Sequence, residues 1–329
     1  MEAIREMYNC DKYMTTIDKV LETIQEYGVA IVPNVLTADE CDNMVSGMWD
    51  YIEGVTAGTK YEIKRDCTGT WKNYQSSKGL FPKHSMLLQH FGIGHSQFLW
   101  DVRQNKSVAD VFGRIWGCKA EELLVSFDGA SLHLPPEVTG HGWYRNSWLH
   151  VDQSYLDTSF KCVQGSVSGY DTNPGDATFA FYERSHLFHA EFRDKFGVTE
   201  KDNWYKLNAE QMAWYEERGV VEKRVSCPRG SLVLWDSRTV HCGVEPLKAR
   251  ETPNIRCVAY VCYQPRSVAT PKDIRRKQEI FEAMRTTTHW AAKPKLFGKL
   301  PRTYGAEVAT FNDVPKPVLT DFGKKLAGF

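Results

Sequence analysis

The chain has 329 residues, of which 42% are hydrophobic and 25% charged, a composition typical of a soluble globular protein. Basic and acidic residues number 41 each, so no net charge would attract nucleic acid or an anionic membrane. No stretch approaches the roughly 20 apolar residues of a membrane span. Nine scattered cysteines without a C-x-x-C pair indicate reduced thiols. We therefore expect a cytoplasmic protein that binds neither nucleic acid nor membrane; no pattern predicts its oligomeric state.

The amino-terminal third is predicted to be mainly helical, with one strand. Apolar spacing predicts an amphipathic helix over 16–26, and the apolar run 28–36 predicts a short strand. Thr37 and Glu40 form a capping-box pattern that should start the next helix. Residues 56–85 are rich in Gly, Lys, Thr and Ser, which is typical of a long loop.

From residue 121 the pattern changes to short strands separated by turn residues. A charged, Trp-rich insertion over about 187–218 looks helical, as does 271–285. The clearest strands are expected at 123–127, 161–170, 177–183, 230–236 and 254–264. Short strands with a turn about every ten residues predict a mainly β sandwich or jelly roll, with helices at both ends packed outside it.

We interpret the chain as one domain without internal repeats. It would comprise a helical amino-terminal part with an entry strand over 1–120, a β core over 121–266 and a helical extension over 267–329. The helical insertion 187–218 would interrupt the core.

The segment WLHVDQS contains two candidate metal ligands, His150 and Asp152. In extended backbone, residues i and i+2 point the same way, so both side chains can bind one ion. This spacing alone is a weak signal. A second such spacing, His189 with Glu191, lies in a helical run where the two side chains diverge, and we interpret it as solvated helix surface.

The third candidate ligand is His241, which follows an apolar strand and a short polar bend. Two histidines and one carboxylate leave open positions for a cosubstrate and O2, the facial arrangement of non-haem Fe(II) oxygenases. Zinc accepts the same donors, so a zinc-dependent hydrolase on a related barrel is an alternative. A non-catalytic small-molecule binding protein is a second alternative, which the intact set of ligands disfavours.

Arg256 lies in the strand NIRCVAYVCYQ, both faces of which are largely apolar. A buried guanidinium needs a planar anion as partner, and the distal carboxylate of 2-oxoglutarate would meet that need. An internal pair with Asp or Glu would also meet it. Arg250 is the alternative anion binder, but it lies in a turn and should be solvated.

These segments together resemble the phytanoyl-CoA dioxygenase family of 2-oxoglutarate oxygenases. The likeness covers roughly 120–266 and extends forward through YGVAIVPNVLTADEC. The segments that carry it are WLHVDQS (148–154), VQGSVSGYD (163–171), ATFAFYERSHLFH (177–189), PRGSLVLWDSRTVHCG (228–243) and IRCVAYVCYQPR (255–266).

The resemblance implies a double-stranded β-helix, a jelly-roll core of the cupin type flanked by amino- and carboxyl-terminal helices. It implies Fe(II), 2-oxoglutarate and O2, with iron bound by His150, Asp152 and His241 and the cosubstrate carboxylate by Arg256. Gln164 is either a second cosubstrate contact or a polar residue on a solvated sheet face. The expected reaction is oxidation of a C–H bond of a small molecule, with release of succinate and CO2. Substrate contacts are expected from 141–148 and from the insertion.

Overall fold

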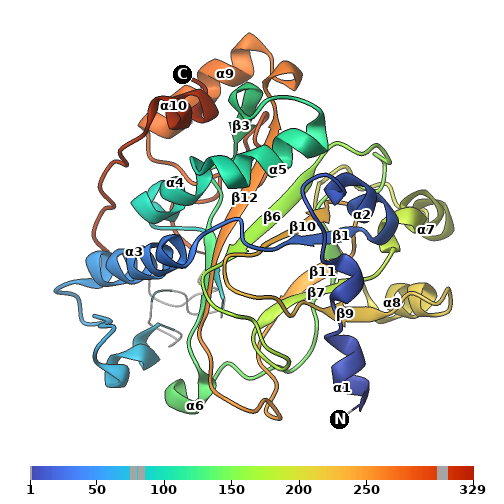
Figure 1. The fold of residues 1–329 in the computed structure, drawn as a ribbon, viewed down its shortest axis with the longest axis horizontal. Helices are drawn as coiled ribbons and strands as arrows, with labels where there is room; N and C mark the ends of the chain where they lie inside the picture. The colour runs from blue at the N-terminus through green and yellow to red at the C-terminus, as the bar shows by residue number, and fades with distance from the viewer. Residues whose placement is uncertain (1, 75–79, 81–85, 302–309) are drawn as a thin grey trace.

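Two antiparallel sheets face each other at the centre of the protein, with helices outside both (Figure 1). The computed structural model describes residues 2–74, 80, 86–301 and 310–329. Strands of the larger sheet run in the order β1–β10–β6–β12–β4–β2, with β3 also paired to β12, and those of the smaller sheet run β8–β5–β11–β7–β9. This is the expected double-stranded β-helix.

The larger sheet contains β1 (Val29–Val32), β2 (Leu87–Leu88), β3 (Leu123–Val125), β4 (Ala130–His133), β6 (Val163–Ser168), β10 (Leu232–Asp236) and β12 (Arg256–Pro265). The smaller sheet contains β5 (His150–Val151), β7 (Thr178–Tyr182), β8 (Tyr205–Lys206), β9 (Glu222–Arg224) and β11 (His241–Val244).

Helices cover the outer face of each sheet. Those against the larger sheet include α3, α4 and α5, of which α5 crosses in front of β12 in Figure 1, while α7 and α8 pack on the smaller sheet. The helices are α1 (Glu2–Met7), α2 (Val20–Tyr27), α3 (Ala38–Thr56), α4 (Gln97–Arg103), α5 (Lys106–Trp116), α6 (Pro136–Thr139), α7 (His189–Phe196), α8 (Ala209–Glu216), α9 (Pro271–Glu282) and α10 (Asp321–Ala327).

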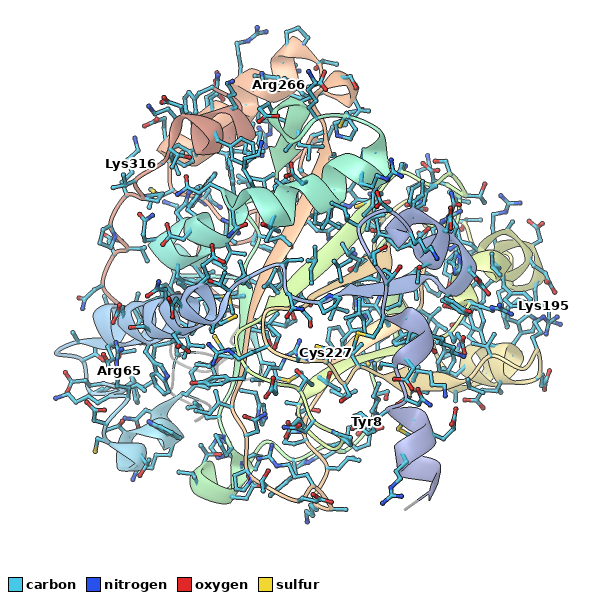
Figure 2. All side chains as sticks on the ribbon, in the orientation of Figure 1. Tyr8, Arg65, Lys195, Cys227, Arg266 and Lys316 are labelled. Carbon is cyan, nitrogen blue, oxygen red and sulfur yellow. The ribbon has the colours of Figure 1, made fainter. Side chains whose placement is uncertain are left out.

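Side chains alternate between two apolar layers along each strand. On β10, Leu232 and Leu234 pack outward against the helices, whereas Val233 and Trp235 point into the space between the sheets. Charged side chains such as Lys195 lie at the edge of the molecule in Figure 2, whereas Cys227 is buried. This alternation gives the two sheets a shared apolar interior, as expected of the sandwich that the short strands and regular turns predicted.

The expected elements appear with small shifts in their bounds. The helix predicted for 16–26 is α2, and the capping box of Thr37 and Glu40 begins α3. The insertion 187–218 is not wholly helical, because it holds the short strand β8 between α7 and α8. Within the predicted loop 56–85, the described part contains a 3-10 helix, Thr68–Asn73, and residues 75–79 and 81–85 lie outside the described residues.

Each described helix is too short or too polar to cross a membrane.

Candidate metal centre

His150 and His241 lie directly opposite each other on β5 and β11. Asp152 follows β5 and is fixed by its backbone N–H, which donates to the carbonyl of Ser237 at 3.0 Å. One potential ligand atom from each of His150, Asp152 and His241 lies within 4.8 Å of the others. The structure therefore brings together all three residues that the sequence singled out.

Backbone carbonyls determine how the two imidazoles are oriented. Nδ1 of His150 lies 3.2 Å from the carbonyl oxygen of Trp148, and Nδ1 of His241 lies 2.8 Å from that of Thr239. Because a carbonyl oxygen only accepts, each Nδ1 must carry the proton, which leaves the Nε2 lone pair free. These Nε2 atoms lie 3.6 Å (His150) and 3.3 Å (His241) from the carboxylate of Asp152.

This donor set fits a divalent metal ion. Two lone pairs and a carboxylate repel one another when nothing positive lies between them, and burial makes that arrangement costly. Burial, followed by the nearby His241, lowers the pKa of His150 to about 4, so the imidazole is neutral at physiological pH, as metal binding requires. Burial opposes ionisation of Asp152, but His150 and His241 outweigh it and hold the pKa of the carboxyl well below its usual range.

Gln164 holds the carboxylate of Asp152 rather than lying on a solvated face. Its side chain is 6% exposed, and its Nε2 donates to Asp152 Oδ2 at 3.0 Å and to Ser237 Oγ at 3.3 Å. The solvated-face interpretation is therefore wrong. A cosubstrate contact by Gln164 stays a prediction.

The two candidate arginines have different surroundings. Arg250 is not solvated as expected: its side chain is 1% exposed and pairs with Glu137 at 2.5 Å and Asp176 at 3.1 Å. Arg256 is 9% exposed, and its Nε donates to Ser131 Oγ at 3.1 Å. Arg256 has no ion pair with a described residue, so its charge is available to an anionic ligand whereas that of Arg250 is already neutralised.

Arg256 points into the same interior as the metal cluster. Cys262 pairs with Gln164 across the sheet, and Arg256 and Tyr260 share the face of Cys262 by two-residue alternation. Tyr260 is only half-buried although it lies in the middle of the central strand β12, so the interior is not completely filled at this level. Ser166, which pairs with Tyr260, adds a small polar side chain to the same wall.

Two residues near the cluster were not predicted individually. Trp204, just before β8, has its ring centroid 6.0 Å from that of His150. His289, in the carboxyl-terminal extension, helps to lower the pKa of Asp152, and its Nε2 is buried without a hydrogen-bond partner in the described chain. The Trp-rich composition of the insertion hinted at Trp204, whereas no local motif marks His289.

Part of the segment 141–148 packs inward. Trp148 stacks on His150 at 4.5 Å and donates its indole N–H to the carbonyl of Gly243 at 2.8 Å. Tyr144 contacts the apolar cluster beneath α7 and α8. Trp148 therefore packs against the metal cluster, Tyr144 packs in the apolar cluster, and Trp204 is the more exposed aromatic residue beside His150.

The second candidate pair, His189 and Glu191, lies on the helix α7, where the two side chains point in different directions as predicted. His189 is nevertheless buried, stacked on Tyr155 at 4.3 Å, so the interpretation as solvated surface is wrong for this residue. Glu191 pairs with Arg218 at the surface.

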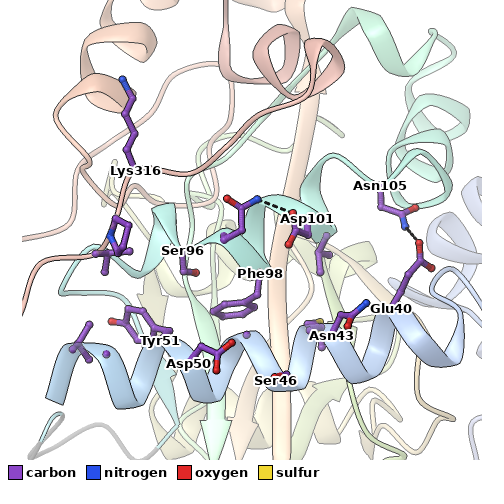
Figure 3. Close-up of a pocket in the computed structure, with 18 of the residues that line it drawn as sticks. Glu40, Asn43, Ser46, Asp50, Tyr51, Ser96, Phe98, Asp101, Asn105 and Lys316 are labelled. Atoms are coloured by element: carbon purple, nitrogen blue, oxygen red, sulfur yellow. Dashed lines mark hydrogen bonds between the residues drawn. The ribbon is translucent and has the colours of Figure 1, made fainter. Parts of the chain in front are cut away.

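A large cavity of about 790 Å³ lies away from the metal cluster, between α3, α4 and residues 313–316 (Figure 3). Carboxylates line it, but most already have partners. Glu40 accepts a hydrogen bond from the side-chain amide of Asn105, and Asp101 accepts one from that of Gln97. None of the three candidate ligands reaches this cavity.

The fold and the cluster place the protein among double-stranded β-helix proteins with a two-histidine, one-carboxylate centre. The sequence profile of the phytanoyl-CoA dioxygenase family (PhyH) matches residues 24–245, more than half of the chain. The chain belongs to this family, which decides against the zinc hydrolase and the non-catalytic binding protein. Enzymes of the family use Fe(II), 2-oxoglutarate and O2.

One curated protein and several solved structures are similar to this chain. Ava biosynthesis cluster protein O from Aspergillus versicolor is 30% identical over 208 residues, which cover 61% of this chain and 65% of that protein. The chain thus spans just under two thirds of this curated relative. The crystal structure of the hypothetical protein JW0805 from Escherichia coli is 12% identical and aligns over 99% of this chain and 89% of its own, with a TM-score of 0.59. The non-haem α-ketoglutarate-dependent epimerase SnoN from nogalamycin biosynthesis is 13% identical, with a TM-score of 0.46 over 76% of this chain and 83% of its own.

Proposed function

We propose that this chain is an Fe(II)- and 2-oxoglutarate-dependent oxygenase that oxidises a C–H bond of a small molecule. His150, Asp152 and His241 hold the iron. The observation that carries this proposal is the convergence of two imidazole lone pairs on a buried carboxylate, with both Nδ1 protons directed to carbonyls. Iron and 2-oxoglutarate, when bound, supply the activation of O2, with conversion of the cosubstrate to succinate and CO2.

The chain's own residues position these groups. The carbonyls of Trp148 and Thr239 fix the imidazole planes, and Gln164 holds the carboxylate of Asp152. An outer hydrogen bond of this kind fixes the tautomer of a ligand and makes it more basic. Trp148, stacked on His150, excludes water from one face of the ligand ring.

Arg256 anchors the distal carboxylate of 2-oxoglutarate. Its guanidinium is nearly buried, has no ion pair with a described residue and shares the interior face with Gln164. A planar guanidinium binds a carboxylate through two parallel hydrogen bonds, so this pairing also sets the direction of the cosubstrate. Ser131 holds Nε of Arg256 and leaves its terminal nitrogens for the ligand.

A small molecule is the substrate, and neither nucleic acid nor membrane is a partner. The zero net charge supports this, because binding to a polyanion depends on clustered basic residues. All nine cysteines are free, which fits a reducing compartment such as the cytoplasm.

The decisive experiment is anaerobic addition of Fe(II) and 2-oxoglutarate, followed by exposure to O2. A weak visible absorption band should appear only when both are present, and succinate should form afterwards. Absence of the band at saturating concentrations of both would contradict the proposal. A band of the same strength with succinate in place of 2-oxoglutarate would show that the band does not report chelation.

A further inference from the structure

Trp204 is unusual for its exposure and its location. Its side chain is 52% exposed, although tryptophan is usually well buried. Its ring centroid lies 6.0 Å from that of His150, with the two planes at 38°. A large aromatic surface is therefore left open to solvent directly beside a candidate iron ligand.

The backbone around Trp204 is firmly held. The strand β8 that follows it pairs with β5, so that Lys206 lies opposite His150. On the other side, Asn203 accepts a hydrogen bond from the N–H of Ser154 at 3.1 Å, and Ser154 Oγ donates to the carbonyl of Glu200 at 2.8 Å. Trp204 is thus tied to the segment that carries His150 and Asp152. A pre-positioned aromatic side chain loses little conformational freedom when a ligand covers it.

We propose that Trp204 is a stacking platform for an uncharged, planar aromatic part of the substrate. This inference rests on the proposed function and names the substrate class of the same site. An indole face favours an offset stack with another flat ring. A ring stacked there lies beside His150, so its adjacent C–H bonds would lie near the residues that would hold the metal.

The charges nearby favour an uncharged ring over a cation. An indole can also bind a cation through its face. Lys206 is exposed and follows Trp204 by two residues in the extended segment that leads into β8, so it lies on the same side as the indole, whereas the exposed acids Glu200 and Asp202 precede the strand. The ammonium group of Lys206 repels a second cation on that side, so the platform disfavours cationic substrates.

The test uses two probes with one carbon skeleton: 2-naphthol, which is flat, and decahydro-2-naphthol, which is saturated. Their dissociation constants are measured by equilibrium dialysis against the anaerobic protein loaded with Fe(II) and 2-oxoglutarate. We expect the native protein to bind 2-naphthol at least fivefold more tightly. Trp204→Ala should lose most of this preference, and Trp204→Phe should keep part of it.

Leu187→Ala is the matched control, because Leu187 is 60% exposed in the same insertion and its loss should leave the preference unchanged. Trp204→Leu keeps apolar area without a flat ring, so it should behave like Trp204→Ala. Equal binding of the two probes, no binding of 2-naphthol, or an unaltered preference in Trp204→Ala overturns the platform. Tighter binding of benzyltrimethylammonium than of 2-naphthol also overturns it.

Failure of the platform and failure of the proposed function give different results. If the native protein shows the Fe(II)–2-oxoglutarate absorption band but no preference for 2-naphthol, only the platform is wrong. If the band is missing, the proposed function is wrong whatever the probes do.

Discussion

At the scale of single residues, the candidate centre depends on which nitrogen of each imidazole carries the proton. The sequence could predict that His150 and Asp152 share a face, because two-residue alternation is a property of any extended backbone. It could not predict the tautomers, which the carbonyls of Trp148 and Thr239 determine. The ligand types were thus predictable, and their orientation was not.

Asp152→Ala and His241→Ala should each abolish Fe(II)-dependent formation of succinate. Each change removes one of three ligands, and no fourth His, Cys, Asp or Glu in the described residues joins the cluster. Fe(II) affinity, measured anaerobically, should fall at least 100-fold while the far-UV circular dichroism stays native. Asp194→Ala, an exposed carboxylate on α7, should behave like the native protein. Succinate formation near the native rate in either ligand variant would exclude this centre.

Arg256→Ala and Arg250→Ala should affect different quantities. Loss of a buried charge-assisted pair costs about 1.5–3 kcal/mol, so Arg256→Ala should raise the apparent KM for 2-oxoglutarate by roughly 10- to 150-fold. Arg250→Ala leaves Glu137 and Asp176 without their partner and should lower the free energy of unfolding by about 3 kcal/mol, with little change in KM. Steady-state kinetics and urea titration of both variants measure these effects. The reverse result would make Arg250 the anchor.

At the scale of secondary-structure elements, local signals were reliable where a local interaction decides the structure. The hydroxyl of Thr37 accepts the N–H of Glu40 at 3.3 Å, and Glu40 accepts the N–H of Thr37 at 2.8 Å. Both bonds lie within four residues, so the sequence alone could predict the start of α3. The two-residue strands β5 and β8 exist because they pair with each other, and β5 also pairs with β11. Such pairing joins residues far apart in the chain, and no local pattern in β8 predicts it.

Thr37→Ala should lower the free energy of unfolding by about 1 kcal/mol, because the first turn of α3 loses its side-chain cap. Fe(II) affinity should not change, since α3 lies outside the larger sheet. Thermal denaturation and anaerobic iron titration measure the two quantities. Thr199→Ala, at an exposed position outside any cap, is the control and should change neither. A loss of iron affinity in Thr37→Ala would mean that α3 influences the centre.

At the scale of the whole molecule, distant parts of the chain form one sheet. The amino-terminal strand β1 pairs with β10, and the carboxyl-terminal helix α10 packs near β3. These contacts support the interpretation of one domain over 1–329, which stays a prediction. The same long-range folding explains why His289 was not found: its place beside Asp152 depends on how the extension after α9 returns to the barrel.

The whole fold also buries histidines that must remain neutral. Burial lowers the pKa of His95 and of His133 to about 3 and that of His189 to about 4. Each uses Nε2 to bond a backbone carbonyl, and each Nδ1 is buried without a partner in the described residues. Protonation would therefore place a charged N–H where no described group accepts it.

Acid should destabilise the protein before its carboxylates titrate. Below the usual histidine pKa of about 6.5, the unfolded chain binds protons that the folded chain does not bind. The free energy of unfolding is therefore highest above pH 6.5 and falls as the pH drops toward 4. Because half of each unfolded histidine is already protonated at pH 6.5, each of the three costs about 1 kcal/mol between pH 6.5 and pH 5.5, and together they should remove about 3 kcal/mol. In metal-free protein His150, whose pKa is also lowered to about 4, adds to this loss.

Urea titrations of metal-free protein at these two pH values measure the difference. His95→Phe removes one titrating group among Phe127 and Phe281, so it should reduce the pH dependence by about a quarter. Stability that is constant between pH 6.5 and pH 5.5 would mean that the folded protein accepts these protons.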